Sequence, residues 1–116
     1  MSIFYQVKDL DLDAKKHLLT DAKKASFKWY INILDCNISL ASKPSSLSFE
    51  EVIRELSEST HVVFINRGID LISGRPYFET GFSTINSGRP DYLLFIHLYP
   101  KEANELIAKY GLTPIN

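Results

Sequence analysis

Histidine and arginine are the residue types of this sequence best suited to phosphodiester chemistry. A nuclease or phosphodiesterase that works without a metal can use two histidines as general acid and general base, and an arginine to bind the phosphate. His61 and His97 lie on separate expected strands, so they meet only if those strands are neighbours in a suitable register. Arg75 or Arg89 would bind the phosphate. The competing interpretation places His97 at the margin of the core, and His17, on a lysine-rich helix face, is expected to be solvated.

Other catalytic and cofactor signatures are absent from the sequence. It contains no GxxxxGK[ST] loop, no GxGxxG after a strand, no HExxH, no GxSxG and no Cys/His cluster with metal-ligand spacing. The single cysteine, Cys36, cannot form an internal disulfide, and its acidic neighbour Asp35 does not favour a reactive thiolate. We therefore predict a protein that is not an enzyme, with no catalytic residue, no cofactor and no metal.

An acidic stripe is the clearest candidate for binding a partner. Between residues 29 and 66 the chain has two basic and five acidic residues, and there Glu51, Arg54, Glu55 and Glu58 follow the spacing i, i+3, i+4 and i+7. Such a stripe can be a solvated helix face, with Arg54 paired to Glu58. It can also be an acidic surface that binds a basic protein and repels nucleic acid. The predicted partner-binding residues are the carboxylates Glu51, Glu55, Glu58, Asp70 and Glu79.

A second candidate interface is the segment from Gly68 to Gly74, which places three large aliphatic residues between two glycines. As a surface loop it would expose apolar area beside charge, as the centres of interfaces do. As a turn packed on a sheet it would belong to the core. The sequence leaves both interpretations open. The tetrapeptide Ser-Gly-Arg-Pro occurs at 73–76 and again at 87–90, and we interpret it as a turn sequence. The alternative is that its two arginines together bind an anion or the carboxylates of a partner.

Apolar residues at helical spacing predict three helices. The first covers residues 14–25 with Asp11 or Asp13 as its N-cap, and the second begins at a capping box in 48–51. The third runs from Pro100 to a stop at Gly111. The helix residues expected to pack on a sheet are Leu18, Val52, Ile53, Leu56, Leu106 and Ile107.

Alternating and β-branched segments predict the strands. We expect them near residues 27–34, 61–67, 77–85 and 91–99, with a short further strand at 37–41. The last two of the four flank the turn residues 86–90 and should form an antiparallel hairpin. The predicted fold class is α+β: a mostly antiparallel sheet of about four to five strands, with about three helices packed on it.

Length and composition are typical of one globular domain spanning 1–116. The chain is 45% hydrophobic and 23% charged, which argues against disorder, and its net charge of −1 predicts affinity for neither nucleic acid nor a membrane. The longest apolar runs are far shorter than the roughly 20 residues that cross a bilayer. The first 13 residues lack the pattern of a secretory signal, so a cytoplasmic location is expected.

The second half of the chain resembles the small cytoplasmic immunity proteins of bacterial contact-dependent growth inhibition and related polymorphic toxin systems. The resemblance covers THVVFINRGIDLISGRPYFETGFSTI followed by DYLLFIHLYPKEANELIAKYG. The resemblance is one of overall pattern and size. It implies a non-catalytic protein that binds a cognate toxin domain, often a nuclease, and covers its active site or substrate-binding surface. Immunity proteins against nucleases are often clearly acidic, whereas this chain is close to neutral.

The functional hypothesis is therefore an immunity protein that neutralises a cognate toxin domain by occlusion, without contacting nucleic acid itself. The alternative is the small metal-independent nuclease described above. A third hypothesis, a subunit of a homo-oligomer, is favoured only by the aromatic content of 12%.

Overall fold

The computed structural model describes residues 2–35, 41–44, 47–83 and 91–115. Within these ranges the chain forms strands and helices in the order β1 (Ile3–Tyr5), α1 (Leu12–Ala25), β2 (Lys28–Asp35), β3 (Ala41–Pro44), α2 (Phe49–Ile53), β4 (Val62–Ile69), β5 (Pro76–Ser83), β6 (Asp91–Leu98) and α3 (Pro100–Tyr110).

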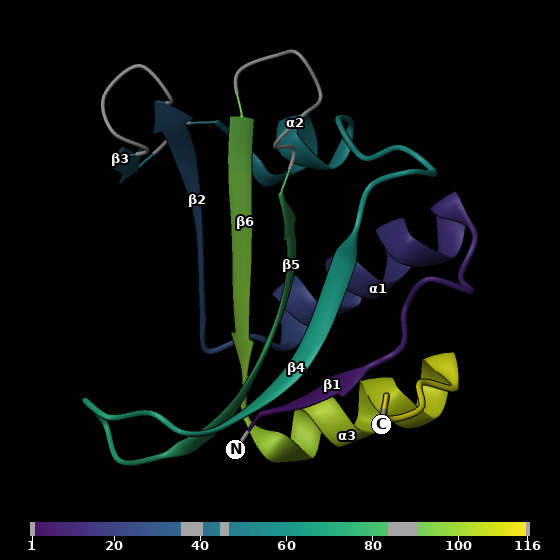
Figure 1. Ribbon diagram of the computed structural model, residues 1–116, viewed down its shortest axis with the longest axis vertical. Helices are drawn as coiled ribbons and strands as arrows, with labels where there is room; N and C mark the ends of the chain where they lie inside the picture. The colour runs from purple at the N-terminus through teal and green to yellow at the C-terminus, as the bar shows by residue number, and fades with distance from the viewer. Residues whose placement is uncertain (1, 36–40, 45–46, 84–90, 116) are drawn as a thin grey trace.

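The strands form one sheet in the order β1-β4-β5-β6-β2-β3, and every neighbouring pair is antiparallel. Helices α1 and α3 pack on the same face of this sheet (Figure 1). The predicted α+β class is confirmed, as is the antiparallel pairing of the last two predicted strands, now β5 and β6. The sheet also has an edge strand, β1, that the sequence analysis did not predict. The predicted strand at 37–41 and turn at 86–90 fall almost wholly outside the described residues.

Local signals explain where the two long helices begin and end. The Asp11 side chain accepts a hydrogen bond from the Ala14 N–H at the start of α1, so of the two predicted caps, Asp11 and Asp13, the structure has Asp11. At the end of α3, Gly111 adopts the left-handed conformation with φ of 63°, which costs glycine little. The predicted second helix is shorter than expected, because α2 ends at Ile53.

A pair of polar contacts joins the two helices. The carboxylate of Asp21 in α1 accepts hydrogen bonds from Lys109 Nζ at 2.7 Å and from the Tyr110 hydroxyl at 2.6 Å. The hydrogen bond from Lys109, followed by that from Tyr110, lowers the pKa of Asp21. Burial, followed by the hydrogen bond to Asp21, raises the pKa of Tyr110. These contacts fix α3 beside α1 over the sheet.

The core lies between the helices and the sheet, and it includes most of the predicted helix residues: Leu18, Val52, Leu56 and Leu106 are buried. Ile53 and Ile107 are partly buried against it. We expect Leu56→Ala or Leu106→Ala to lower the free energy of unfolding by about 2–5 kcal/mol, because each removes buried methyl groups and leaves a cavity. Urea unfolding followed by circular dichroism measures this loss. Wild-type stability in both variants would contradict the assigned buried faces.

Candidate partner-binding surface

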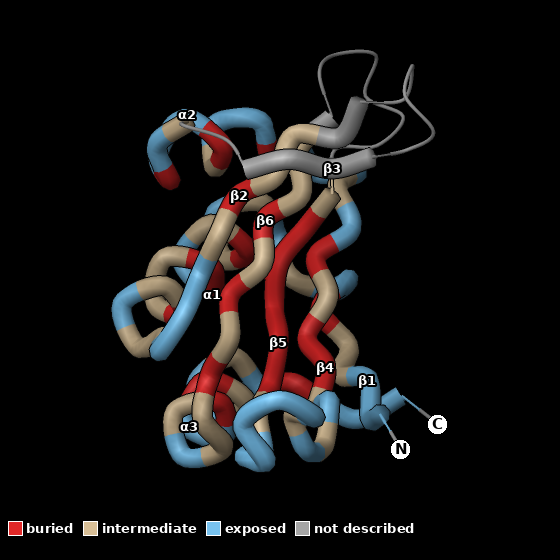
Figure 2. The backbone as a smooth tube through the Cα atoms, turned by 90° about the vertical axis from the view of Figure 1, so that its left-hand side faces the viewer, coloured by how far each residue is buried: buried red, intermediate tan, exposed pale blue. Residues whose placement is uncertain are grey.

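The most exposed apolar side chains of the described residues lie where β4 turns into β5. Leu71 is 98% exposed and Ile72 is 97% exposed, and Ile69 beside them is also exposed. We call residues 69–75 the hairpin tip. It extends beyond the rest of the sheet in Figure 1 and is the exposed loop at the foot of β4 and β5 in Figure 2. Of the two interpretations that the sequence left open, the structure therefore supports the surface loop.

Hydrogen bonds within the hairpin tip hold its backbone in one conformation. The Asp70 N–H donates to the Arg75 carbonyl and the Gly74 N–H donates to the Asp70 carbonyl, each at 2.8 Å. The Asp70 carboxylate also accepts from the Ser73 N–H at 2.9 Å. Hydrogen bonds from the Ser73 hydroxyl and main chain lower the pKa of Asp70. Gly74 completes the turn with a φ of 70°.

An ordered turn with two neighbouring, fully exposed aliphatic side chains is suited to protein binding. Single exposed leucines are common on protein surfaces, but an adjacent pair with nothing packed on either is less so. Burying each side chain against a partner would contribute about 1.5–3 kcal/mol. Because the hydrogen bonds already fix the backbone, little conformational entropy is lost on binding. Leu71 and Ile72 are therefore the candidate anchors of an interface.

The acidic residues singled out in the sequence do not form one surface. Glu51, Glu55 and Glu58 are exposed, as predicted. They belong to α2 and the segment after it, near the end of the sheet where β4 begins, whereas the hairpin tip with Asp70 lies at the opposite end (Figure 1). Glu79 is buried, with 7% of its surface exposed. Asp70 and Glu79 therefore do not extend the acidic stripe: the length of β4 separates Asp70 from it, and Glu79 is buried opposite Ile65 in the middle of that strand.

Glu79 belongs instead to a polar and aromatic cluster on the sheet face opposite α1 and α3. Its carboxylate accepts a hydrogen bond from Arg67 Nε at 2.9 Å. In the sheet register it lies directly opposite His97. The ring centroids of Tyr77 and Tyr30 lie 5.2 Å and 5.8 Å from that of His97. The sequence analysis missed this cluster, although the alternation of β5 and β6 could have placed its residues on common strand faces.

Burial dominates the electrostatics of this cluster. Removal from water lowers the pKa of His97, and the nearby Glu79 carboxylate only partly opposes the effect. Burial, with a smaller contribution from Glu79, raises the pKa of Tyr30. His97 is therefore neutral and Tyr30 is protonated at neutral pH. This result agrees with the interpretation of His97 as a residue at the margin of the core.

The pKa of His97 predicts a pH dependence of stability. The pKa of His97 in the folded protein is below the ordinary value of 6.5. At a pH between these two pKa values, the unfolded chain therefore binds more protons than the folded protein does. Stability should therefore fall as the pH drops below about 6.5. Urea unfolding of the wild type and of His97→Gln between pH 5 and pH 8 measures the effect. The variant should lose part of this pH dependence. If the free energy of unfolding changes with pH equally in the two proteins, the prediction is contradicted.

The two histidines of the nuclease hypothesis are not brought together. His61 comes directly before the first residue of β4. His97 in β6 pairs with Glu79 in β5, and Glu79 pairs with Ile65 in β4. Four residues along a strand correspond to about 13 Å, and two strand spacings separate them further. Arg75 donates to the Tyr99 hydroxyl at 3.2 Å. Arg89 and Cys36 lie outside the described residues.

Comparison of the chain with protein-family models, curated proteins and solved structures found no match in any of the three. Within the described part of the chain, no three His, Cys, Asp or Glu side chains are grouped as metal ligands would be. None of the described helices has the length and apolar character needed to span a membrane.

Proposed function

We propose that this protein is an immunity protein that binds a cognate toxin domain and neutralises it by covering its active or substrate-binding site. The observation that carries the proposal is the hairpin tip, a hydrogen-bonded turn that exposes Leu71 and Ile72 almost completely. Such a feature suits recognition of another protein better than catalysis. The resemblance of residues 60–111 to immunity proteins names the class of partner, a toxin domain such as a nuclease.

In this proposal the hairpin tip inserts into a groove of the toxin. Leu71 and Ile72 fill an apolar pocket, while the charged residues Asp70 and Arg75 at the base of the turn form the polar rim of the interface. An inserted loop excludes substrate without chemistry of its own. The acidic residues Glu51, Glu55 and Glu58, at the other end of the sheet, then act only at long range, through the rate of association.

Co-expression with candidate toxin domains tests the proposal. In bacteria that express a growth-inhibiting nuclease domain, this chain should restore growth when the domain is its cognate toxin, and the two proteins should co-purify as a complex. An unrelated toxin domain is the control and should not be neutralised. If a panel of toxin domains that includes those encoded beside the gene for this chain yields neither rescue nor a complex, the proposal fails.

The runner-up function, a metal-independent nuclease, has one observation in its favour, the grouping of His97 with Glu79, Tyr30 and Tyr77. We expect the purified protein to leave RNA, DNA and simple phosphodiesters intact, because His61 is remote from this group and cannot act as its second acid or base. Gel and fluorescence assays of cleavage measure this. Turnover by the wild type that disappears in His97→Gln or His61→Ala would contradict the expectation and favour the nuclease.

A further inference from the structure

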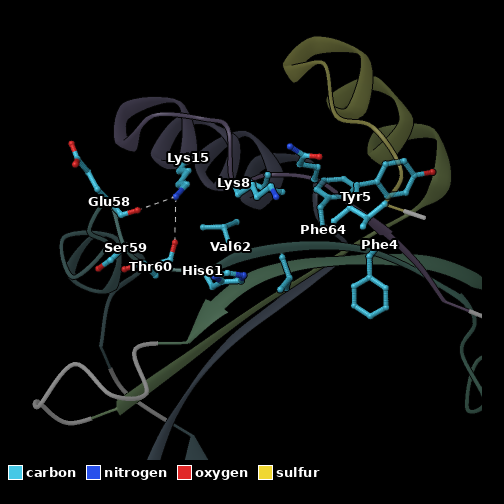
Figure 3. A pocket seen from close by; sticks show the side chains of 14 residues that line it. Phe4, Tyr5, Lys8, Lys15, Glu58, Ser59, Thr60, His61, Val62 and Phe64 are labelled. Atoms are coloured by element: carbon cyan, nitrogen blue, oxygen red, sulfur yellow. Dashed lines mark hydrogen bonds between the residues drawn. The ribbon is translucent and has the colours of Figure 1, made fainter.

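A cavity of about 340 Å³ lies beside the beginning of β4. Its walls come from β1 and the residues after it, from the first turn of α1, and from residues 58–64 (Figure 3). This volume is within the range of small-molecule sites, which starts near 300 Å³. The cavity is remote from the hairpin tip, so the inference below does not rest on the proposed function.

The path of the N-terminal segment creates this cavity. β1 pairs with β4 only between Ile3–Tyr5 and Phe64–Asn66. The next residue, Gln6, donates its N–H to the Thr113 carbonyl, which draws the chain away from β4 and towards the C-terminal segment. Among the described residues no strand therefore continues beside Val62 and Val63 on this side of the sheet. Helix α1 lies over this gap (Figure 3).

Lys15 places a buried positive charge at one wall of the cavity. It is only 5% exposed, although lysine is rarely buried without an anionic partner. Its Nζ donates to the main-chain carbonyls of Glu58 and Thr60 at 3.3 Å and 3.4 Å, which is long for such bonds. The Glu58 carboxylate points away from it (Figure 3). The described residues place no carboxylate within 4.0 Å of Nζ, since the ion pairs found among them are Arg67–Glu79 and Lys109–Asp21.

The ammonium group therefore has capacity for an anion. It has three N–H donors, of which the two carbonyls occupy two, and neither carbonyl neutralises its charge. A buried charge without a counter-ion is costly, and a ligand anion within the cavity would remove that cost. Lys15 lines the cavity, so an anion bound there would lie beside this side chain.

The remaining walls define the rest of the ligand. Val7, Val62, Phe64 and Ile115 contribute apolar surface around the cavity, and its other lining residues include Gln6, Lys8, Ser59, Thr60 and His61. Lys15 is the one buried ammonium group among the described lining residues, since Lys8 is exposed. With apolar surface beside it, this group matches a single negative charge on an apolar body better than it matches a phosphate dianion. We propose that this pocket binds a small organic monocarboxylate with an apolar chain or ring, with the carboxylate on Lys15 Nζ and the apolar part against Val62 and Phe64.

Titration of the full chain followed by NMR tests the pocket with defined probes. Hexanoate and phenylacetate should shift the methyl signals of Val62 and the amide signals of residues 59–63. The neutral isosteres hexanamide and phenylacetamide should bind at least about 10-fold more weakly, because they lose the charged hydrogen bond. Acetate should bind more weakly than hexanoate, because it lacks the apolar chain. Equal binding of acids and amides, no binding at millimolar concentration, or inorganic phosphate binding as well as hexanoate would each overturn the proposal.

Two variants, each replacing one lysine of α1, test whether Lys15 is the residue that binds the carboxylate. Lys15→Met keeps an aliphatic stem of similar length and should weaken hexanoate binding at least about 10-fold. Lys24→Met removes an exposed lysine from the other end of the same helix and should bind hexanoate as the wild type does. Unchanged binding by a folded Lys15→Met would overturn the assignment. Should that variant not fold, the comparison of acid with amide on the wild-type protein decides the question alone.

Discussion

Gly81→Ala is expected to lower the free energy of unfolding by more than about 3 kcal/mol, a large part of the 5–15 kcal/mol that stabilises most domains. A Cβ atom added at Gly81 would lie 1.9 Å from the carbonyl oxygen of Leu94 in β6. Main-chain atoms of a central strand cannot move aside as a flexible side chain can. The variant must therefore separate β5 from β6 locally, at the centre of the sheet. Thermal unfolding should show a melting temperature lower by about 10 °C or more.

Gly111→Ala is the matched control for this prediction. Gly111 has a left-handed φ of 63°, and a Cβ there would meet nothing within 4 Å. Its replacement should cost only the strain of that conformation, about 1–2 kcal/mol. If Gly81→Ala is as stable as Gly111→Ala, the close approach of β5 to β6 does not exist in solution.

Elements with local signals could be predicted from the sequence. The cap at Asp11, the proline at position 100 and the stop at Gly111 each act on neighbouring residues. The sequence therefore predicted the bounds of α3, and it placed α1 with its start two residues late and its cap open between Asp11 and Asp13. α2 shows where this fails. After Ile53 the α-helical hydrogen bonds give way to tighter ones, in which the N–H groups of Glu55 and Leu56 each bind the carbonyl three residues earlier. The α-helix ends there, but Leu56 is still buried in the core.

Features that depend on distant partners could not be predicted. β1 has three residues, too few for a period to be detected, and it exists because β4 offers an edge between Phe64 and Asn66. The burial of Glu79 has the same origin. Alternation places Glu79 on one face of β5, but only the assembled sheet puts Arg67 and His97 beside it. The carboxylate that the sequence suggested for a partner is therefore already paired within the fold.

The hairpin tip belongs to both groups. Its glycines and its three aliphatic residues were visible in the sequence, but their exposure depends on how far β4 and β5 extend beyond the helices. A loop of the same composition beneath a helix would have been core. We therefore propose the hairpin tip, rather than the acidic stripe, as the main interface.

Under the proposed function, replacing Leu71 and Ile72 together by aspartate should weaken binding to the cognate toxin at least about 100-fold and abolish growth rescue. Each side chain is an expected anchor, and anchors of this kind contribute 2 kcal/mol or more. The aspartates would have to lose their hydration in an apolar pocket without a partner. The double variant should fold normally, since both wild-type side chains are almost fully exposed and pack on nothing. Surface plasmon resonance measures the affinity, and thermal unfolding checks the fold.

Reversal of Glu51, Glu55 and Glu58 to lysine is the companion experiment, because it separates anchoring from electrostatic steering. These carboxylates lie at the other end of the sheet, so their reversal should slow association at low salt and leave the dissociation rate almost unchanged. The hairpin-tip variant should instead accelerate dissociation at any salt concentration, because it removes desolvated contacts rather than long-range charge. If the triple reversal destroys binding while the Leu71 and Ile72 variant binds normally, the toxin occupies the acidic end of the molecule. The exposed aliphatic pair would then have no part in neutralisation.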